Sequence, residues 1–588
     1  MPNKARFRLR FIAFFILLFG VIFVGRLYFL QIVHGKDFRE EAEGQYVATL
    51  PSIYDRGTIY FRGKDGKLIA GATLSGGYLI AINPKLITDP EAAYARIAEV
   101  IELPKEEFLA KAGKRDDPYE EIAMKVPEAQ MERLKELKIP GLQAYRQTWR
   151  YYPGGALAAA VLGFVGHNES EFAGRYGLEA YYNDTLARRD ENLYVNFFAE
   201  LFHNLSETIF ERGEQEEGDL VLTIEPSVQS YFEKELEAVA SEWHSDETGG
   251  IIMDPKTGAI YAMAVDPAFD LNQYGKVKDP RVYANPIIQN VYEMGSIVKP
   301  LTMASGLDAG VVTAKSVYND SGYVTLNNRT FGNFDGKARG PGTSMQEVLN
   351  QSLNTGVAFV VSQLGNQRFA EYFLKKFRLG EETGIDLPGE REGLMSNFSS
   401  TRDIEYATAA FGQGIAVSPI SMAASLAILG NGGVSISPHV VEEIRYESGR
   451  VKKFSPNPSE QVIKKETSEE ITRMLVAVVD DALLGGTVKI PEYSIAAKTG
   501  TAQIARPREQ GGGYYDDRYL HTFFGYFPAY DPKFIVFLYT YYPKEAKYAS
   551  HTLTHPFIRT AKFLLHYYNI PPDRDPNAEK VTRAMSGH

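Results

Sequence analysis

The sequence has 588 residues, of which 44% are hydrophobic and 23% charged; this excludes a mostly disordered chain and predicts two or more folded domains. A net charge of −11 argues against a general nucleic-acid-binding protein, because phosphate contacts require clustered Lys and Arg. The absence of cysteine excludes disulfides, thiolate metal sites and a cysteine nucleophile, and the ten histidines form no HExxH pair of a zinc hydrolase.

The N-terminus is basic and is followed by a long apolar segment. Residues 1–10 carry four basic side chains and no acid, and residues 11–33 are apolar except for Arg26 and a few polar positions. About 20 apolar residues span the hydrocarbon core of a bilayer, so residues 11–33 are predicted to form one tilted transmembrane helix. The basic residues 1–10 are then a cytoplasmic tail. A cleaved signal peptide is the alternative, but no small-x-small site follows the apolar segment.

Residues 34–215 are predicted to form a mixed, non-catalytic domain. Short strand-like pieces alternate with turn residues at 57–60, 68–70 and 78–82. The pattern between Asp89 and Leu137 is helical and rich in charge. The stretch ERGEQEEGD at 211–219 is acidic and has no large apolar side chain, which indicates a domain boundary there.

Residues 216–570 are predicted to form a second domain. A strand, an amphipathic helix from about Pro226 and a hairpin over 249–264 open it, and helices and loops are expected from about 279 to 470. Three strands and a closing helix follow at 493–504, 521–529, 534–542 and 557–568. This order favours an α+β fold in which helices flank an antiparallel five-stranded sheet. Residues 571–588 are polar and are predicted to be a flexible tail.

An S-x-x-K tetrad lies at Ser296–Lys299. On a helix, residues i and i+3 share a face, so the Lys299 amine can reach the Ser296 hydroxyl. The amine becomes a base for this weak nucleophile if burial or a second cation lowers its pKa. Gly295 allows the chain to turn tightly into the helix. A helix-capping serine beside a surface lysine is the alternative interpretation of such a tetrad.

Two further short motifs follow. Ser352 and Asn354 precede an apolar helix, where they either cap the helix or supply a relay hydroxyl and an amide for a substrate carbonyl. The tetrad KTGT at 498–501 lies in a predicted strand. Its Gly500 either forms a bulge or provides room for a substrate peptide that is added to the sheet edge. The Lys and Thr side chains of this tetrad are suited to bind a carboxylate.

In this order, behind a membrane anchor, the three motifs resemble the signature set of penicillin-recognising serine enzymes. The chain from Phe11 to about Tyr568 is similar to class B penicillin-binding proteins, which are monofunctional peptidoglycan transpeptidases. The supporting motifs are DRGTIY (55–60), GKLIA (66–70), RYYPGGALAAAVLGFVG (150–166), GLEAYYNDTL (177–186), TGIDLPGE (383–390) and GQGIAVSPISMA (412–423). Met294 and Leu353 depart from the usual family pattern, next to functional atoms.

The resemblance implies a catalytic role for five residues. Ser296 would attack the carbonyl of the penultimate D-Ala of a stem peptide and expel the terminal D-Ala, with Lys299 as the base. Ser352 and Lys498 would pass a proton to the leaving amine. Asn354 would hold the acyl amide. An amine from a neighbouring stem would then resolve the ester and form the cross-link, and the resemblance implies no cofactor and no metal.

The resemblance also implies how the substrate is held. The backbone N–H groups of Ser296 and Thr501 would form the oxyanion hole. Thr499 and Thr501, on either side of Gly500, would hold the terminal carboxylate. β-Lactams would acylate Ser296 and stay attached.

The expected location and partners follow from the same resemblance. The protein would be a single-pass protein of the bacterial inner membrane with its catalytic domain outside, in the periplasm, and residues 34–215 as a pedestal, the dimerisation domain of the family. Its partners would be stem peptides of glycan derived from lipid II, β-lactams, and a membrane-embedded glycosyltransferase of the SEDS type. Asn354 favours a role in septal synthesis during division. Elongation, β-lactamase or sensor activity, D,D-carboxypeptidase activity and a scaffold that activates the polymerase are the alternatives.

Overall fold

The computed structural model describes residues 55–168, 171–188, 216–456 and 459–575, together with Phe14, residues 17–20, Phe23 and Arg26. Most of the predicted transmembrane segment 11–33, and the predicted tail beyond residue 575, lie outside these described residues. Within them, no helix combines the length and the apolar character needed to cross a bilayer. The chain divides into two compact units. Of the residues that follow Asp55, the smaller unit contains Leu74–Trp149.

The smaller unit packs three helices against a small sheet. Its elements are most of β2 (Leu68–Ile82), α3 (Pro90–Ala98), α4 (Lys105–Ala112), β3 (Glu120–Val126), α5 (Glu128–Glu136) and β4 (Leu142–Tyr151). Its core is formed by Ile80 and Ile82 of β2 with Ile97, Phe108 and Leu134 of the helices. The helical prediction for 89–137 is wrong over β3, which pairs antiparallel with β2. Pairing with a neighbouring strand overrides the weak local preference of this charged segment.

The larger unit contains Arg56–Thr73 and the chain from Arg150 onward. Part of it is a sheet in the order β15-β14-β7-β1-β2, which brings distant segments together. The strands are β1 (Ile59–Arg62), β7 (Gly218–Leu222), β14 (Val441–Tyr446), β15 (Val451–Lys453) and the start of β2. This unit also contains the hairpin β5–β6 (Val165–Asn168, Glu171–Gly174) and the short helices α6 (Ala159–Leu162), α7 (Gly177–Tyr181) and α8 (Asn183–Leu186).

A buried ionic cluster joins three of the family-like motifs in this unit. Glu179 of α7 accepts from Arg56 Nε and Arg150 Nε, each at 2.6 Å, and all three side chains are at most 1% exposed. Arg150 also donates to the Gly57 carbonyl at 2.8 Å, and Arg56 to the Glu179 carbonyl at 2.7 Å. The motifs at 55–60, 150–166 and 177–186 therefore meet around one carboxylate that forms ion pairs with two guanidinium groups.

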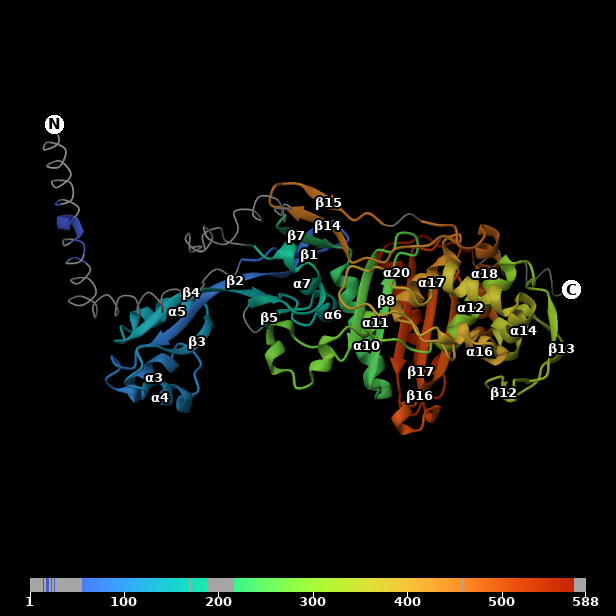
Figure 1. The fold of residues 1–588 in the computed structure, drawn as a ribbon, viewed down its shortest axis with the longest axis horizontal. Helices are drawn as coiled ribbons and strands as arrows, with labels where there is room; N and C mark the ends of the chain where they lie inside the picture. Colours follow the sequence, from blue (N-terminus) through green and yellow to red (C-terminus); the bar gives the residue numbers. More distant parts are fainter. Residues whose placement is uncertain are drawn as a thin grey trace, which may run out of the picture. The chain divides into compact units, whose positions relative to one another are not determined.

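The predicted five-stranded antiparallel sheet is confirmed, with the strand order β16-β17-β18-β8-β9 (Figure 1). Its strands are β8 (Glu247–Met253), β9 (Ile260–Asp266), β16 (Ala496–Ala505), β17 (Tyr514–Phe527) and β18 (Phe534–Tyr541). The hairpin predicted over 249–264 is β8–β9, and all neighbours pair antiparallel. β16, which carries the KTGT tetrad, is an edge strand.

Helices cover both faces of this sheet, and the side chains of β17 point alternately into the two cores that the helices form. Phe523 and Phe527 belong to a core shared with α10 (Pro226–Trp243) and α20 (Thr554–Tyr567). Phe524 and Tyr526 point to the opposite core, because successive side chains of a strand alternate. That second core contains α11 (Pro286–Gln289), α12 (Lys299–Asp308), α14 (Asn354–Leu364), α17 (Pro419–Gly430) and α18 (Lys465–Ala477).

Two regions of this domain differ from the predictions. The stretch 279–470, predicted as helices and loops, also contains β14, β15 and four short strands: β10 (Val317–Asp320), β11 (Tyr323–Leu326), β12 (Arg329–Gly332) and β13 (Gly340–Ser344). The four short strands pair only with one another and bury few side chains, so they lack an apolar alternation. At the C-terminus, Asp573 accepts from the Ser494 N–H and Arg574 pairs with Asp480, so the start of the predicted flexible tail is anchored.

Candidate active site

The nucleophile candidate lies where a 3₁₀ turn leads into α12. Residues Gly295–Val298 form the turn, and α12 begins at Lys299. Gly295 has φ +63°, and a Cβ on it would lie 2.8 Å from the Thr501 carbonyl oxygen. Only glycine fits both the left-handed conformation and this close approach to β16. The predicted tight turn is confirmed, and it places half-buried Ser296 directly beside the KTGT strand.

The three predicted motifs meet at one cavity of about 970 Å³. The predicted site residues that line it are Ser296, Ser352, Asn354, Lys498, Thr499 and Thr501. Lys299 lies in the adjoining core with no exposed surface, and Gly500 packs against the turn that carries the serine. Aromatic rings line the same cavity, among them Phe331, Phe411 and Tyr519. The arrangement is a cleft lined by the Ser296 hydroxyl and the Lys498 amine, with the Lys299 amine buried in the adjoining core.

Two buried lysines converge on one hydroxyl group. Lys299 Nζ donates to the Ser352 carbonyl at 2.5 Å and lies 3.2 Å from Ser352 Oγ. Lys498 Nζ donates to the same Oγ at 3.0 Å and to the Thr499 carbonyl at 3.1 Å. In the described structure, no carboxylate lies within 4.0 Å of either amine. Ser352 therefore bridges two buried amines that have no counter-charge nearby in the described structure.

This arrangement lowers the pKa of both amines. Burial lowers the pKa of Lys299 well below its ordinary value, and the nearby charge of Lys498 lowers it further. Burial lowers the pKa of Lys498 to about 7. The sequence predicts that Lys299 becomes a base if burial or a second cation lowers its pKa, and both causes are present. The alternative of a surface lysine is wrong, because Lys299 is fully buried.

The segment before α14 is a strained turn and not a helix cap. Ser352 has φ +54°, and the N-cap position of α14 is occupied by buried Leu353, so the helix has no side-chain capping hydrogen bond. The capping interpretation of Ser352 and Asn354 is therefore wrong. A non-glycine residue in the left-handed region costs free energy and often marks a functional position. Asn354 Nδ2 donates to the Gly332 carbonyl at 2.8 Å and lines the cavity.

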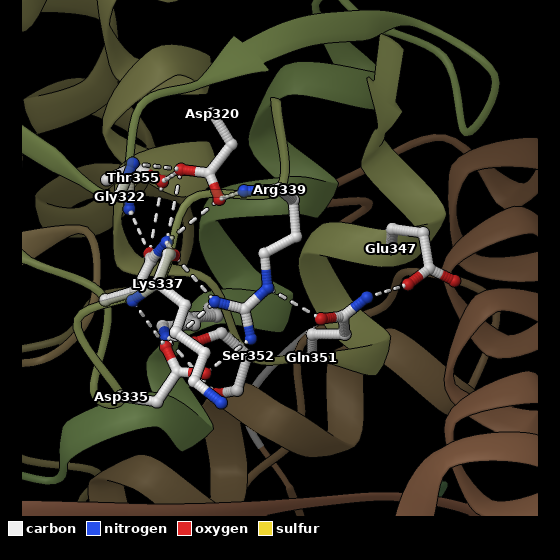
Figure 2. Close-up of polar contacts among 11 residues, drawn as sticks. Asp320, Gly322, Asp335, Lys337, Arg339, Glu347, Gln351, Ser352 and Thr355 are labelled. Atoms are coloured by element: carbon white, nitrogen blue, oxygen red, sulfur yellow. Dashed lines mark hydrogen bonds and ion pairs between the residues drawn. The ribbon is translucent and has the colours of Figure 1, made fainter. Parts of the chain in front are cut away.

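A buried carboxylate that the sequence did not single out holds this turn from behind. Asp320 accepts from Thr355 Oγ1 at 2.7 Å, from Asn333 Nδ2 at 3.0 and 3.1 Å, and from the Gly322 and Arg339 N–H groups at 3.0 Å (Figure 2). Burial opposes its charge, but these hydrogen bonds lower the pKa of Asp320 overall. Asp320 thus remains ionised and fixes the first turn of α14 next to Asn354.

A second polar chain holds the turn from the side of the cleft. The Arg339 guanidinium makes two 2.8 Å hydrogen bonds to Asp335 and one of 2.8 Å to Gln351, which in turn donates to Glu347 (Figure 2). Gln351 directly precedes Ser352, so this chain restrains the bridging hydroxyl. The only sequence signal for it was the polar run NFDGKARG at 333–340, which carries no recognisable spacing.

The edge strand β16 supplies the other wall of the cleft. A Cβ on Gly500 would lie 2.8 Å from the Met294 carbonyl oxygen, so the space around Gly500 is taken by the turn before Ser296. The interpretation that this glycine makes room for substrate is wrong. The Thr501 carbonyl faces Gly295, and in a strand the N–H and C=O of one residue point to the same edge. The Thr501 N–H therefore points to the edge where Ser296 lies.

The fold and the cleft define a class of protein. A serine on the 3₁₀ turn that leads into a helix, two buried lysines that share a second hydroxyl, and a free sheet edge form the site of a lysine-dependent serine acyltransferase. Comparison with known proteins agrees. Residues 248–561 match the penicillin-binding protein transpeptidase domain, and residues 53–211 match the penicillin-binding protein dimerisation domain. The chain belongs to this family as a class B penicillin-binding protein.

Individual relatives support this assignment over most of the chain. Stage V sporulation protein D of Bacillus subtilis is 30% identical over 92% of this chain and 83% of its own length. The peptidoglycan D,D-transpeptidase FtsI of Escherichia coli is 29% identical over 76% of this chain and 72% of its own. The structure of penicillin-binding protein 3 of Mycobacterium tuberculosis with aztreonam has a TM-score of 0.67 at 22% identity, covering 88% of this chain and 97% of that one.

Proposed function

We propose that this protein cross-links peptidoglycan as a D,D-transpeptidase through an acyl-enzyme on Ser296. The observation that carries the proposal is the convergence of Lys299 and Lys498 on Ser352 beside the serine. Burial and the charge of Lys498 lower the pKa of Lys299, and a lowered pKa makes a lysine amine a better proton acceptor at physiological pH. The relatives named peptidoglycan D,D-transpeptidase provide the substrate class.

Acylation begins with attack of Ser296 Oγ on the carbonyl carbon of the penultimate D-Ala of a stem peptide. Neutral Lys299 takes the hydroxyl proton as the new C–O bond forms. The N–H groups of Ser296 and Thr501 stabilise the negative oxygen of the tetrahedral intermediate, and such preorganised donors contribute about 3–4 kcal/mol each. The C–N bond then breaks, and Ser352, protonated in turn by Lys498, gives a proton to the amine of the departing D-Ala.

The substrate adds to the free edge of β16, so its backbone hydrogen bonds continue the sheet. Asn354 Nδ2 holds the acyl amide at one side of the cleft, and the hydroxyls of Thr499 and Thr501 hold the terminal carboxylate, with Gly500 between them. After D-Ala leaves, an amine of a second stem attacks the ester in the reverse sequence of proton transfers. The aromatic lining of the cleft limits access of water, which favours the amine over hydrolysis and leaves β-lactam adducts long-lived.

We place the protein in septal synthesis, with elongation as the second candidate, because Asn354 in the second motif resembles the division-type members of the family. The apolar segment 11–33 anchors it in the inner membrane with the catalytic domain in the periplasm. Residues 34–215 and 216–570 serve as pedestal and transpeptidase domain. A membrane-embedded SEDS-type glycosyltransferase supplies the nascent glycan that the enzyme cross-links.

The test is covalent labelling of the full-length protein in detergent with a fluorescent penicillin, followed by mass spectrometry of the labelled peptide. We expect a long-lived adduct on Ser296. Ser296→Ala abolishes it, and Ser550→Ala, which removes another hydroxyl from the cleft wall, retains it.

The alternatives give different results in the same experiment. Hydrolysis of penicillin without a persistent adduct identifies a β-lactamase. No adduct in folded protein refutes the catalytic proposal and favours the scaffold role. Release of D-Ala from a stem peptide without formation of a cross-link identifies a D,D-carboxypeptidase.

A further inference from the structure

A second cavity, of about 490 Å³, adjoins the catalytic cleft. Gln503 of β16 lines both cavities, so one strand forms a continuous wall from the KTGT tetrad into the second space. The other walls are the segment Asn290–Glu293, just before the nucleophile turn, together with Glu247, Arg391 and Tyr541. No step of the proposed reaction uses this cavity.

The second cavity contains two carboxylates that lack a cation. Glu247 accepts from the hydroxyls of Tyr292 at 2.7 Å and Tyr539 at 2.8 Å, and Glu293 accepts from Tyr514 at 2.9 and 3.1 Å. Within the described part of the chain, neither has a Lys, Arg or His nitrogen within 4.0 Å. Burial raises the pKa of both groups, so each is under-compensated. A bound ammonium group would supply the missing charge.

A cation on the wall of the same cavity also lacks a partner. The backbone N–H of Arg391 donates to the Ile288 carbonyl at 3.0 Å, but its exposed guanidinium makes no hydrogen bond or ion pair among the described residues. Guanidinium groups bind carboxylates through two parallel hydrogen bonds. The cavity thus offers one site for an ammonium and one for a carboxylate, which together suit an α-amino carboxylate.

The expected path of the substrate leads to this cavity. With the scissile carbonyl at the Thr501 N–H and the terminal carboxylate toward Lys498, the stem runs antiparallel to β16. The residues before the two D-alanines therefore lie toward Gln503 and Ala505, which both line the second cavity. At about 3.4 Å per residue, the residue preceding the penultimate D-Ala is roughly 7 Å or less from Thr501 along the strand.

We infer that the second cavity binds the side chain of the stem residue that precedes D-Ala-D-Ala, and that this side chain ends in an α-amino carboxylate, as in a diaminodicarboxylic acid. Arg391 binds its carboxylate, and Glu247 and Glu293 bind its ammonium. The inference rests on the proposed transpeptidase function and makes this cavity the determinant of which stem chemistry is accepted.

The experiment compares second-order acylation rates of Ser296 by two penicillins in the full-length protein. One has an acyl side chain that ends in a free α-amino carboxylate, and the other has the same chain with its amine acetylated and its carboxylate amidated. We expect the charged probe to react about 10–100-fold faster, since a hydrogen bond to a charged group contributes about 1.5–3 kcal/mol. In Arg391→Gln the ratio of the two rates falls toward 1, whereas Arg368→Gln, an exposed arginine away from both cavities, retains it.

Equal rates for the two probes in the unaltered protein would refute the inference, and no variant is needed for that result. A large ratio that survives in Arg391→Gln and in Glu293→Gln would also refute it, because the preference would then arise elsewhere. If neither penicillin reacts with Ser296, the proposed function itself fails, so the two failures are distinguishable.

Discussion

The Arg56–Glu179–Arg150 cluster and the pair Lys299 and Lys498 both remove charged side chains from water, but only the first contains a counter-charge. In the first cluster, one carboxylate is hydrogen-bonded to two guanidinium groups at 2.6 Å. In the second, two amines meet at a neutral hydroxyl. The same cost of burial is offset by ion pairing in the first case and by loss of protons in the second.

The difference separates a structural site from a chemical one. Arginine keeps its proton in a protein interior, so buried arginines require a partner and hold segments together. Lysine releases its proton readily when buried, and the resulting neutral amine is a base. The residue type in each cluster therefore matches its role: the arginines join three motifs of the chain, and the lysines activate a serine.

The largest effect is expected for the base. Lys299→Gln should slow acylation of Ser296 by fluorescent penicillin about 10²–10⁴-fold, the usual contribution of a general base. The thermal unfolding midpoint should not fall, because a neutral side chain replaces a poorly compensated amine. Lys562→Gln, an exposed lysine on α20, is the matched control. A loss of less than tenfold would show that Lys299 is not the base.

A change in the Arg56–Glu179–Arg150 cluster should lower stability and leave the acylation rate unchanged. Glu179→Gln leaves two buried guanidinium groups without a counter-charge and should lower the free energy of unfolding by about 3–5 kcal/mol. Protein that remains folded should still acylate at its normal rate, since the cluster does not line the cleft. Calorimetry and labelling on one preparation measure both quantities. Slow acylation with unchanged stability would contradict the division of roles between the two clusters.

The coupling between the lysines predicts a shift in pH dependence. The acylation rate should rise with pH as Lys299, the base, loses its proton, and should fall again as Lys498, the proton donor to Ser352, loses its proton near pH 7. The charge of Lys498 lowers the pKa of Lys299, so Lys498→Gln should raise that pKa and move the rising limb to higher pH. Lys547→Gln removes an exposed cation at the cleft and should leave the limb in place. A shift of the rising limb to lower pH in Lys498→Gln would contradict the inference that the charge of Lys498 lowers the pKa of Lys299.

The smallest effect concerns the support behind the bridging hydroxyl. Thr355→Val removes the 2.7 Å hydrogen bond to Asp320 and leaves that buried carboxylate with one donor fewer. We expect a loss of about 1–3 kcal/mol in unfolding free energy and a modest fall in acylation rate. Ser362→Ala, on the exposed face of the same helix, should change neither. If acylation falls as far as in Lys299→Gln, Thr355 has a chemical and not a supporting role.

Much of the fold of the catalytic domain could be predicted from the sequence. Strands such as β18 are continuous apolar runs, because both faces of the central sheet are covered, and the turn residues between them mark their ends. The three motifs are short and local, so their presence needed no tertiary information. By contrast β3 and the four strands β10–β13 were not predicted, since they are held by pairing partners and not by their own apolar pattern.

What the sequence by itself determined is the set of chemical groups and the periodicity of the elements that carry them: a serine and a lysine three residues apart, a glycine that permits the turn, and alternating strands. Only the tertiary structure decided which groups share an atom. Ser352 lies 53 residues from Lys299 and 146 from Lys498, yet both amines reach its hydroxyl. Local periodicity predicts which face of a helix or strand a side chain occupies. The burial of an ionisable side chain, and hence its pKa, depends on distant segments that packing brings together.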